Sequence, residues 1–352
     1  MSIRRNLGID FDVCRLMFEG VAINLPAMKN IIPNQLGRRG KNNLAQGEAL
    51  HPFHVQRVRL LQPDVHPRLH SDLLTKIDLL LRVVTCIDLT SLCGDDSECN
   101  VQRLCHKAEN PIEPYLLKQL GVNPEKFHVG AVCVYPARVK DCVKTLKGLK
   151  SFVPVASVAA GFPSAQSHLD TKLYEIKCCV KDGAKEIDIV ISRNLVLDGE
   201  WEELYNEVKA MKEACGSEIS MKTIIAAGEL GSLENIYKAS IVCMAAGSDF
   251  IKTSTGKESV NATLVIGRTM ARAIKAYYDK TGFEVGFKPA GGIRTAKEAL
   301  LWQTMIRKEL GCRWFYPHLF RIGASGLLSD IEQNIFLKFY GYVPPKCIFA
   351  YQ

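Results

Sequence analysis

From about Thr85 to Tyr340, short apolar segments alternate repeatedly with amphipathic helical segments, and few folds accommodate this pattern. Segments such as 201–211 and 233–244 carry apolar residues at the 3.6-residue period of a helix. Eight such units in about 250 residues are typical of a (β/α)₈ TIM barrel, and a doubly wound open sheet is the alternative architecture. The eight segments with strand character are 85–90, 130–135, 153–159, 186–191, 221–226, 250–255, 285–290 and 319–324.

Side-chain parity favours the barrel over the open sheet. In a barrel, alternate side chains of each strand point inward, while the others pack beneath the helices. In the segment 186–191, the isoleucines form one face and leave Glu186, Asp188 and Val190 on the other, which must then point inward. The same parity places further charged side chains of other strands on the inward face: Asp88, Lys252 and Lys288.

The chain before the first strand falls into two parts. Between residues 25 and 67 it is rich in Pro, Asn, Gly and basic residues and has no sustained period, which predicts a mostly disordered segment. Apolar residues at helical spacing over 73–81 predict a helix that precedes the barrel. We therefore expect an N-terminal extension over 1–70, a barrel domain over 71–341 and a C-terminal tail over 342–352.

Composition narrows the class of protein. Residues 1–84 hold 12 basic and 7 acidic side chains, +5 of the formal net charge of +8, so the main body is nearly neutral. We therefore expect no nucleic-acid partner, although a small anionic ligand fits. No apolar run approaches the ~18 residues of a membrane span. The 13 cysteines show neither a C-x-x-C pair nor zinc-site spacing, which favours reduced thiols and a cytoplasmic location.

Three lysines on the predicted inward faces, Lys222, Lys252 and Lys288, point to chemistry. A buried ammonium is costly to desolvate, and the structural interpretation for any one lysine is a buried ion pair with Asp88 or Asp188. Two crowded ammonium groups repel each other, which lowers the pKa of an amine toward neutrality. A neutral lysine can attack a carbonyl and form a Schiff base, while a nearby carboxylate transfers protons.

Glycines follow the last two predicted strands. Gly291-Gly292 comes after the seventh strand, and Gly323-Ala-Ser325-Gly326 is at the end of the eighth. TIM barrels commonly bind phosphate with the backbone of these two loops, because glycine lets the backbone approach an anion closely. A plain turn is the alternative, but the position after strands seven and eight favours a phosphate site.

Seven motifs at successive strands together give the chain a specific resemblance. It resembles the deoxyribose-phosphate aldolases, most closely the animal form, over about residues 85–340. These enzymes are class I aldolases, or carbon-carbon lyases, of deoxyribonucleoside catabolism that need no metal or cofactor. The motifs are CIDLTSL from Cys86, AVCVYPARV from Ala131, PVASVAAGFP from Pro154, EIDIVI from Glu186, GSDFIKTSTGK from Gly247, VGFKPAGGIR from Val285 and RIGAS from Arg321.

The resemblance implies a role for each inward-facing charged residue. Lys252 of FIKTSTGK is the Schiff-base residue, Lys288 of GFKPAGG is the neighbour that keeps the nucleophile neutral, and Asp188 of EIDIV transfers protons. Asp88 and Lys222 orient the substrate and the catalytic network. The implied reaction is the reversible cleavage of 2-deoxy-D-ribose 5-phosphate to D-glyceraldehyde 3-phosphate and acetaldehyde.

The resemblance also implies a phosphate site and a pocket cysteine. We interpret that cysteine, Cys133, as a small apolar filler and not as a catalytic group. A homo-oligomer is possible, and neither a membrane nor a nucleic acid is required. The residues expected to hold the phosphate are Gly256, Lys257, Gly291, Gly292, Gly323 and Ser325.

Some positions depart from the family pattern, and other functions stay open. Gly326 and Ala227 stand where relatives usually carry hydroxyl side chains, and the role of Tyr351 near the C-terminus is undetermined. One alternative is a Schiff-base aldolase that acts on a keto sugar phosphate. A second is a catalytically silent phosphosugar-binding or scaffold protein whose basic N-terminal extension recruits RNA or a protein partner.

Overall fold

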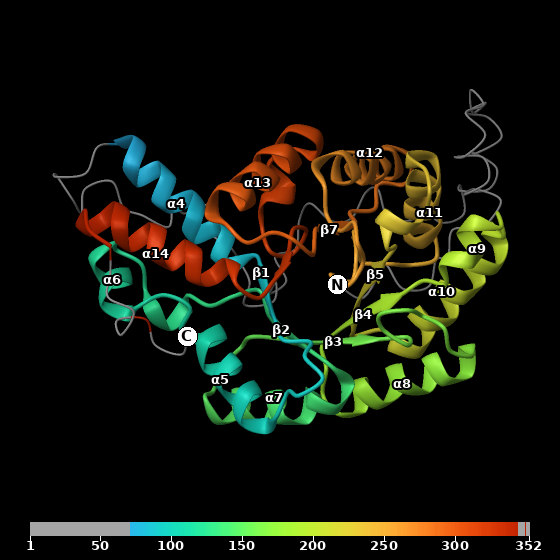
Figure 1. The fold of residues 1–352 in the computed structure, drawn as a ribbon, viewed down its shortest axis with the longest axis horizontal. Helices are drawn as coiled ribbons and strands as arrows, with labels where there is room; N and C mark the ends of the chain where they lie inside the picture. The colour runs from blue at the N-terminus through green and yellow to red at the C-terminus, as the bar shows by residue number, and fades with distance from the viewer. Residues whose placement is uncertain (1–70, 344–348, 350–352) are drawn as a thin grey trace, which may run out of the picture.

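Eight short parallel strands follow one another in sequence order around a barrel (Figure 1). The computed structural model describes residues 71–343 and residue 349. All eight predicted strands are present, each somewhat shorter than its apolar segment. The strands are β1 (Ile87–Thr90), β2 (Ala131–Val134), β3 (Val155–Ala159), β4 (Glu186–Val190), β5 (Ser220–Ile224), β6 (Phe250–Lys252), β7 (Gly286–Lys288) and β8 (Ile322–Ala324).

The ring closes between the last two strands. The hydrogen-bonded order runs from β7 through β6, β5, β4, β3, β2 and β1 to β8, so each strand up to β7 pairs with its neighbour in sequence. Single parallel bridges join Phe287 to Phe320 and Ala290 to Gly323, and the Gly323 N–H donates to the Pro289 carbonyl at 2.9 Å. These contacts confirm the barrel and exclude the doubly wound open sheet.

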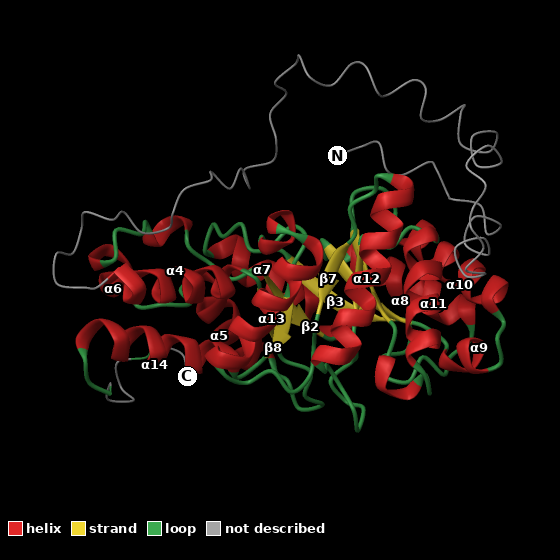
Figure 2. Cartoon of the chain, turned by 90° about the horizontal axis from the view of Figure 1, so that it is seen from above, coloured by secondary structure: helices red, strands yellow, loops and turns green. Residues whose placement is uncertain are grey.

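Helices surround the strands, as the view in Figure 2 shows. Between successive strands, one or two helices return the chain to the start of the next strand, in the crossover connection that parallel strands require. The α-helices are α4 (Ser71–Thr85), α5 (Glu98–Glu109), α6 (Pro114–Gln119), α7 (Val139–Gly148), α8 (Leu169–Lys181), α9 (Arg193–Leu197), α10 (Trp201–Cys215), α11 (Leu233–Ala245), α12 (Leu264–Thr281), α13 (Ala296–Leu310) and α14 (Leu327–Tyr340). Short 3₁₀ turns are η1 (Pro124–Lys126), η2 (Pro136–Arg138), η3 (Ala227–Glu229) and η4 (Cys312–Phe315).

The helix predicted before the barrel is α4. Its apolar positions Ile77, Leu80 and Leu81 are buried, and the helix packs against α13 and α14 and leads into β1 (Figure 1). The predicted extension over 1–70 lies outside the described residues, as does most of the tail from 342 to 352. No helix within residues 71–343 is both long and apolar enough to cross a membrane.

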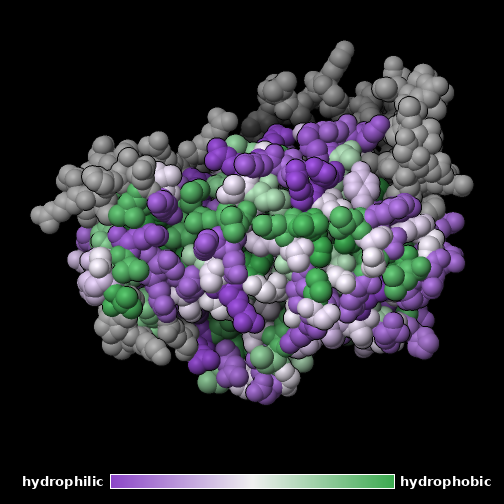
Figure 3. Space-filling model, turned by 45° about the horizontal axis from the view of Figure 1, so that its top comes forward, coloured by the Kyte–Doolittle hydropathy of each residue, from purple (hydrophilic) through white to green (hydrophobic). Residues whose placement is uncertain are grey.

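The main core lies between the strands and the helices. Ile187 and Ile189 of β4 belong to this core, whereas Glu186 and Asp188 of the same strand are buried inside the barrel. The predicted parity is therefore confirmed for β4. Apolar side chains lie among hydrophilic ones on the face seen in Figure 3. Leu264 and Val265 of α12 and Leu301 of α13 are exposed apolar residues.

Candidate active site

Strand register brings the predicted lysines together. Asp188 on β4 pairs with Lys222 on β5, and Lys252 on β6 pairs with Lys288 on β7. Residues that pair across parallel strands share a face, so these side chains enter the barrel at neighbouring positions. Below this layer, Phe250 pairs with Gly286. A Cβ on Gly286 would lie 2.3 Å from the Phe250 ring, so the glycine makes room for the aromatic floor beneath the two lysines.

Asp188 is the centre of the cluster. Its Oδ2 accepts hydrogen bonds from Lys252 Nζ at 2.9 Å and from Lys288 Nζ at 2.7 Å, and its Oδ1 accepts one from Lys222 Nζ at 2.9 Å. Lys252 and Lys288 are therefore neighbours across a single oxygen atom. The side chains of Lys222, Lys288 and Asp188 are fully buried, while Lys252 retains 4% exposure.

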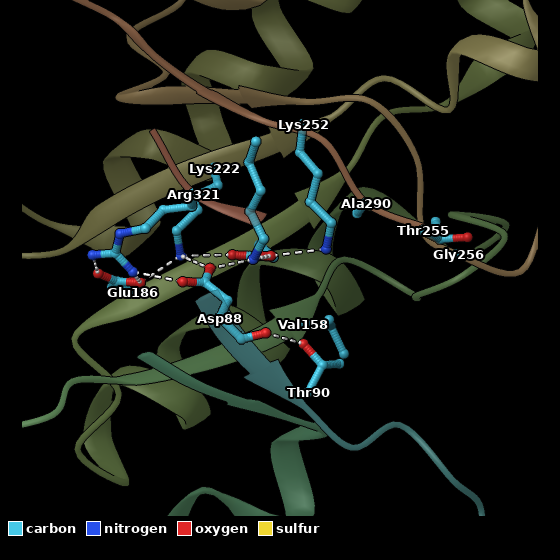
Figure 4. Close-up of polar contacts among 12 residues, drawn as sticks. Asp88, Thr90, Val158, Glu186, Lys222, Lys252, Thr255, Gly256, Ala290 and Arg321 are labelled. Atoms are coloured by element: carbon cyan, nitrogen blue, oxygen red, sulfur yellow. Dashed lines mark hydrogen bonds and ion pairs between the residues drawn. The ribbon is translucent and has the colours of Figure 1, made fainter. Parts of the chain in front are cut away.

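A second carboxylate and an arginine extend the network (Figure 4). Asp88 Oδ2 lies 2.5 Å from Lys288 Nζ, and Asp88 Oδ1 accepts from Arg321 Nη1 at 2.6 Å. Glu186 contacts Arg321 Nη2 at 2.9 Å and Lys222 Nζ at 2.6 Å. Both aspartates thus serve as the predicted ion-pair partners of the lysines.

Glu186 and Arg321 were not predicted as site residues. Parity placed Glu186 on the inward face, and Arg321 begins the motif RIGAS, but neither pattern indicated that the two side chains meet inside the barrel. They come from β4 and from the residue before β8, 135 positions apart in the sequence. The sequence signal that could have predicted this pair is Glu186 itself, because a buried carboxylate at the start of an inward face requires a cationic partner.

The electrostatics of the cluster hold most groups in their charged forms. Burial alone would raise the pKa of Asp188, but the charges of Lys222, Lys252 and Lys288 outweigh it and hold that pKa well below its usual range. Burial would lower the pKa of Lys288, but Asp188 and Asp88 raise it above its usual value. The pKa of Lys222 is raised in the same way, by Asp188 and Glu186 against burial.

The cluster holds one more cation than anions. Uncompensated charge in a buried network is costly, so the network is electrically balanced when one of the cations is neutral. An arginine does not lose its proton in a protein, which leaves the choice to the lysines. The three carboxylates and four cations are Asp88, Glu186, Asp188, Lys222, Lys252, Lys288 and Arg321.

Cys133 lies on an apolar wall inside the barrel. It packs in a small cluster with Leu92, Ala156 and Val158, apart from the main core. Burial raises the pKa of the Cys133 thiol, which keeps it protonated. These contacts fit the interpretation of Cys133 as an apolar filler, and they give the barrel interior one charged side and one apolar side.

The structure brings several of the predicted phosphate residues together at the ends of β6, β7 and β8. A Cβ on Gly256 would lie 3.8 Å from the Gly291 Cα, and one on Gly323 would lie 3.3 Å from the Lys288 side chain. Lys257 Nζ donates to the Leu92 carbonyl at 3.1 Å across the barrel opening. Gly292 follows Gly291 in the loop after β7, where its added Cβ would meet nothing within 4 Å, and Ser325 comes directly after β8.

The departures from the family pattern occupy defined positions. Gly326 is the N-cap of α14, and a Cβ there would meet nothing within 4 Å. Ala227 begins a 3₁₀ turn after β5 and is buried, where its N–H donates to the Thr253 carbonyl at 2.8 Å. Tyr351 lies outside the described residues.

Comparison with known proteins identifies the family. Residues 82–329 match the profile of the DeoC/LacD family aldolase. The chain is 61% identical to deoxyribose-phosphate aldolase of Mus musculus and 59% identical to that of Bos taurus, each over 257 residues that cover 73% of this chain and 80% of the relative. The fold resembles the tetrameric deoxyribose phosphate aldolase of Aeropyrum pernix, with a TM-score of 0.55 and 24% identity over 75% of this chain and 97% of that one. The chain therefore belongs to the DeoC/LacD family of aldolases.

Proposed function

We propose that this aldolase cleaves 2-deoxy-D-ribose 5-phosphate reversibly to D-glyceraldehyde 3-phosphate and acetaldehyde through a Schiff base. The observation that carries the proposal is the buried cluster in which three lysine amines share Asp188 and in which cations exceed carboxylates by one. The substrate follows from the relatives of Mus musculus and Bos taurus, both deoxyribose-phosphate aldolases.

Lys252 is the nucleophile in this proposal. It has one carboxylate partner, Asp188, whereas Lys288 contacts two and Lys222 contacts three. Loss of its proton therefore breaks the fewest ion pairs and balances the cluster. Its 4% exposure, against full burial of the other two amines, also gives a carbonyl carbon access to Lys252 Nζ.

In the cleavage direction, Lys252 and Asp188 carry out the chemical steps. The neutral Lys252 amine adds to C1 of the open-chain sugar, water leaves, and an iminium forms. Asp188, through a water molecule, accepts the proton of the C3 hydroxyl as the C2–C3 bond breaks. Because the surrounding lysines make Asp188 a weak base, it passes this proton on. Protonation of the acetaldehyde enamine at C2 and hydrolysis of the iminium restore Lys252.

The other polar residues hold the substrate. Asp88 and Lys222 orient the charged side of the cavity, and Lys288 supplies the second positive charge beside Lys252. The phosphate rests on Gly256 and Lys257 after β6 and on the loops after β7 and β8, so binding energy at the phosphate end positions C1 at the amine. The predicted loop residues that complete this site are Gly291, Gly292, Gly323 and Ser325.

Three further assignments belong to the proposal. We assign the barrel domain to 71–341, because α4 begins at Ser71 and α14 ends at Tyr340, with flanking segments over 1–70 and 342–352. The exposed apolar side chains on α12 and α13 support a homo-oligomer. The cysteines of the described residues carry free thiols, which supports a cytoplasmic location.

Trapping of the intermediate tests the function. We expect sodium borohydride with deoxyribose 5-phosphate to attach a stable adduct to Lys252, identified by peptide mass spectrometry, and acetaldehyde to be released without borohydride. Adduct on Lys222 would contradict the assignment of the nucleophile. Trapping with a ketose phosphate alone would favour the keto-sugar aldolase, and binding of deoxyribose 5-phosphate without acetaldehyde release would favour the silent phosphosugar-binding protein.

A further inference from the structure

An arginine outside the lysine cluster ties together loops at the mouth of the barrel. Arg193 is the first residue of α9, directly after β4. Its Nη1 donates to the Ser164 carbonyl at 2.8 Å and its Nη2 to the Pro163 carbonyl at 2.9 Å, both in the loop after β3. Its Nε lies 2.6 Å from Glu229 in the loop after β5, and its Nη2 lies 3.6 Å from Glu258 in the loop after β6.

The position of Arg193 is itself fixed from behind. The preceding residue, Ser192, donates its N–H to Glu207 of α10 at 3.1 Å and its hydroxyl to the same carboxylate at 2.7 Å. Lys172 of α8, almost fully buried, contacts Glu207 at 2.6 Å and Ser192 Oγ at 2.7 Å. A buried, fully paired network of this kind rigidifies the backbone that carries it. The backbone that carries Arg193 is therefore held rigidly in place.

Glu258 lies between Arg193 and the backbone of the loop after β6. The Glu258 side chain is 1% exposed, and its carboxylate accepts the backbone N–H groups of Thr255, Gly256 and Lys257 at 2.9, 3.1 and 3.2 Å. It also accepts the Thr255 hydroxyl at 2.7 Å. Three consecutive N–H groups that converge on one anion form a backbone nest, and here a carboxylate of the same loop fills it.

The filled nest decides what this loop can offer to a phosphate. The N–H groups of Gly256 and Lys257 already donate to Glu258. The loop therefore offers a phosphate the Lys257 ammonium and the glycine Gly256, which lies close to Gly291. The neighbouring loop packs directly on this segment: a Cβ on Gly228 would lie 2.0 Å from the Val260 carbonyl oxygen. Arg193 thus compensates the charge of a buried carboxylate that shapes the loop beginning directly after Lys252.

We propose that Arg193 is a positioning residue for the substrate phosphate, acting through Glu258 on the loop after β6. This inference rests on the proposed function, and it deepens it by separating the phosphate end of the site from the amine end. Arg193 touches neither the lysine cluster nor Asp188. Its loss should therefore weaken recognition of the phosphate and leave the reaction at Lys252 intact.

Two conservative variants test the proposal. Arg193→Lys keeps the charge but loses the fork that reaches several loops, and Glu258→Gln keeps the shape but replaces one acceptor oxygen with a donor. In each, we expect the KM for deoxyribose 5-phosphate and the Ki of inorganic phosphate to rise about tenfold, since misplaced substrate contacts cost that much or more. We expect kcat and KM for unphosphorylated 2-deoxyribose and borohydride trapping of acetaldehyde, none of which uses the phosphate site, to stay unchanged.

Controls separate positioning from a general loss of structure. Glu309→Gln removes a carboxylate from an ion pair with Arg268 outside the loops and should change none of these quantities. If Arg193→Lys does not fold, Glu258→Gln carries the test, and its acetaldehyde trapping reports an intact barrel.

Three results would overturn the proposal. They are an unchanged KM for the phosphosugar, an equal change for both sugars, or a lower KM in Glu258→Gln, which would mean that the carboxylate competes with phosphate for the nest. A wild-type chain that releases no acetaldehyde would refute the proposed function, whereas fully active variants would refute only the role of Arg193.

Discussion

Removal of the positive charge of Lys288 should make Lys252 unreactive, although Lys252 itself is unchanged. In Lys288→Met, the cluster holds three carboxylates and three cations, so charge balance now requires Lys252 to keep its proton. Lys252 also loses the repulsion of a neighbouring ammonium that shares the same Asp188 oxygen, at 2.9 and 2.7 Å. Both effects act in one direction and favour the protonated, unreactive amine.

The size of the effect follows from the geometry. The two contacts with one oxygen place the amines roughly 5 Å apart, and two unit charges at this separation interact by about 3 kcal/mol at an effective dielectric constant of about 20. Since one pH unit corresponds to about 1.4 kcal/mol, the midpoint of the pH–rate profile should move up by about two units. At neutral pH the population of the neutral amine, and with it the rate of trapping, should fall about a hundredfold.

The assay is borohydride trapping of acetaldehyde as a function of pH, because this small aldehyde needs no phosphate site. We expect the Lys288→Met rate to climb about tenfold per pH unit and to recover toward the wild-type plateau in alkaline buffer. Lys288→Arg keeps the charge and should retain the wild-type midpoint. Loss of one partner of a buried ion pair also costs about 3–5 kcal/mol of stability, so circular dichroism must first establish that the variant is folded.

Two outcomes would contradict an electrostatic role for Lys288. If folded Lys288→Met kept the wild-type midpoint, the charge of Lys288 would have no influence on the nucleophile. If its rate were lower by the same factor at every pH, Lys288 would act by shape or by proton transfer, and not by electrostatic repulsion.

Three further predictions address other parts of the site. Cys133→Ala should keep kcat/KM within about threefold, because the thiol fills apolar space; a loss of a hundredfold would assign it a chemical role. Gly291→Ala should raise the KM for deoxyribose 5-phosphate and lower stability by about 1–3 kcal/mol in thermal unfolding, because φ is +84° and the Cβ would lie 2.6 Å from Asn261; unchanged values of both would contradict this. Burial would raise the pKa of Asp88 and Asp188, but the neighbouring cations outweigh burial and lower both pKa values. The ionised carboxylates therefore contribute their full stability above the unfolded-state pKa of about 4, and this contribution is lost as the pH falls toward the folded-state pKa values. Urea unfolding should therefore give a free energy that begins to fall below about pH 4, and a steep fall already at pH 6 would contradict the assignment.

Much of the site could be predicted because strand parity is local. The alternation of Glu186, Asp188 and Val190 with isoleucines requires only that a strand have one buried apolar face, and the same reading applies to Lys252 and Lys288. The order of the strands followed once parity favoured the barrel, because successive strands of a (β/α)₈ barrel lie side by side. What parity cannot give is which inward side chains touch across the barrel.

The contacts of Arg321 and Glu258 could not be predicted from local sequence patterns. Arg321 meets Glu186 only because the barrel closes and faces the residue before β8 toward β4. Glu258 was part of no predicted motif, yet its carboxylate fills the backbone nest of its own loop and lies beside Arg193 from another strand end. The Arg321–Glu186 and Arg193–Glu258 pairs join residues far apart in the sequence, so no local period predicts them.

Local patterns in the amino-acid sequence were enough to predict the eight strand–helix units, the inward face of the charged strands, the three lysines and Asp188. How the charges are shared depends on the folded barrel: which amine has a single carboxylate partner, which retains contact with solvent, and that four cations surround three anions. The difference arises because periodicity reports burial, which is a property of one residue and its own strand. Charge balance is a property of the whole closed ring, and it exists only when all the strands stand in place.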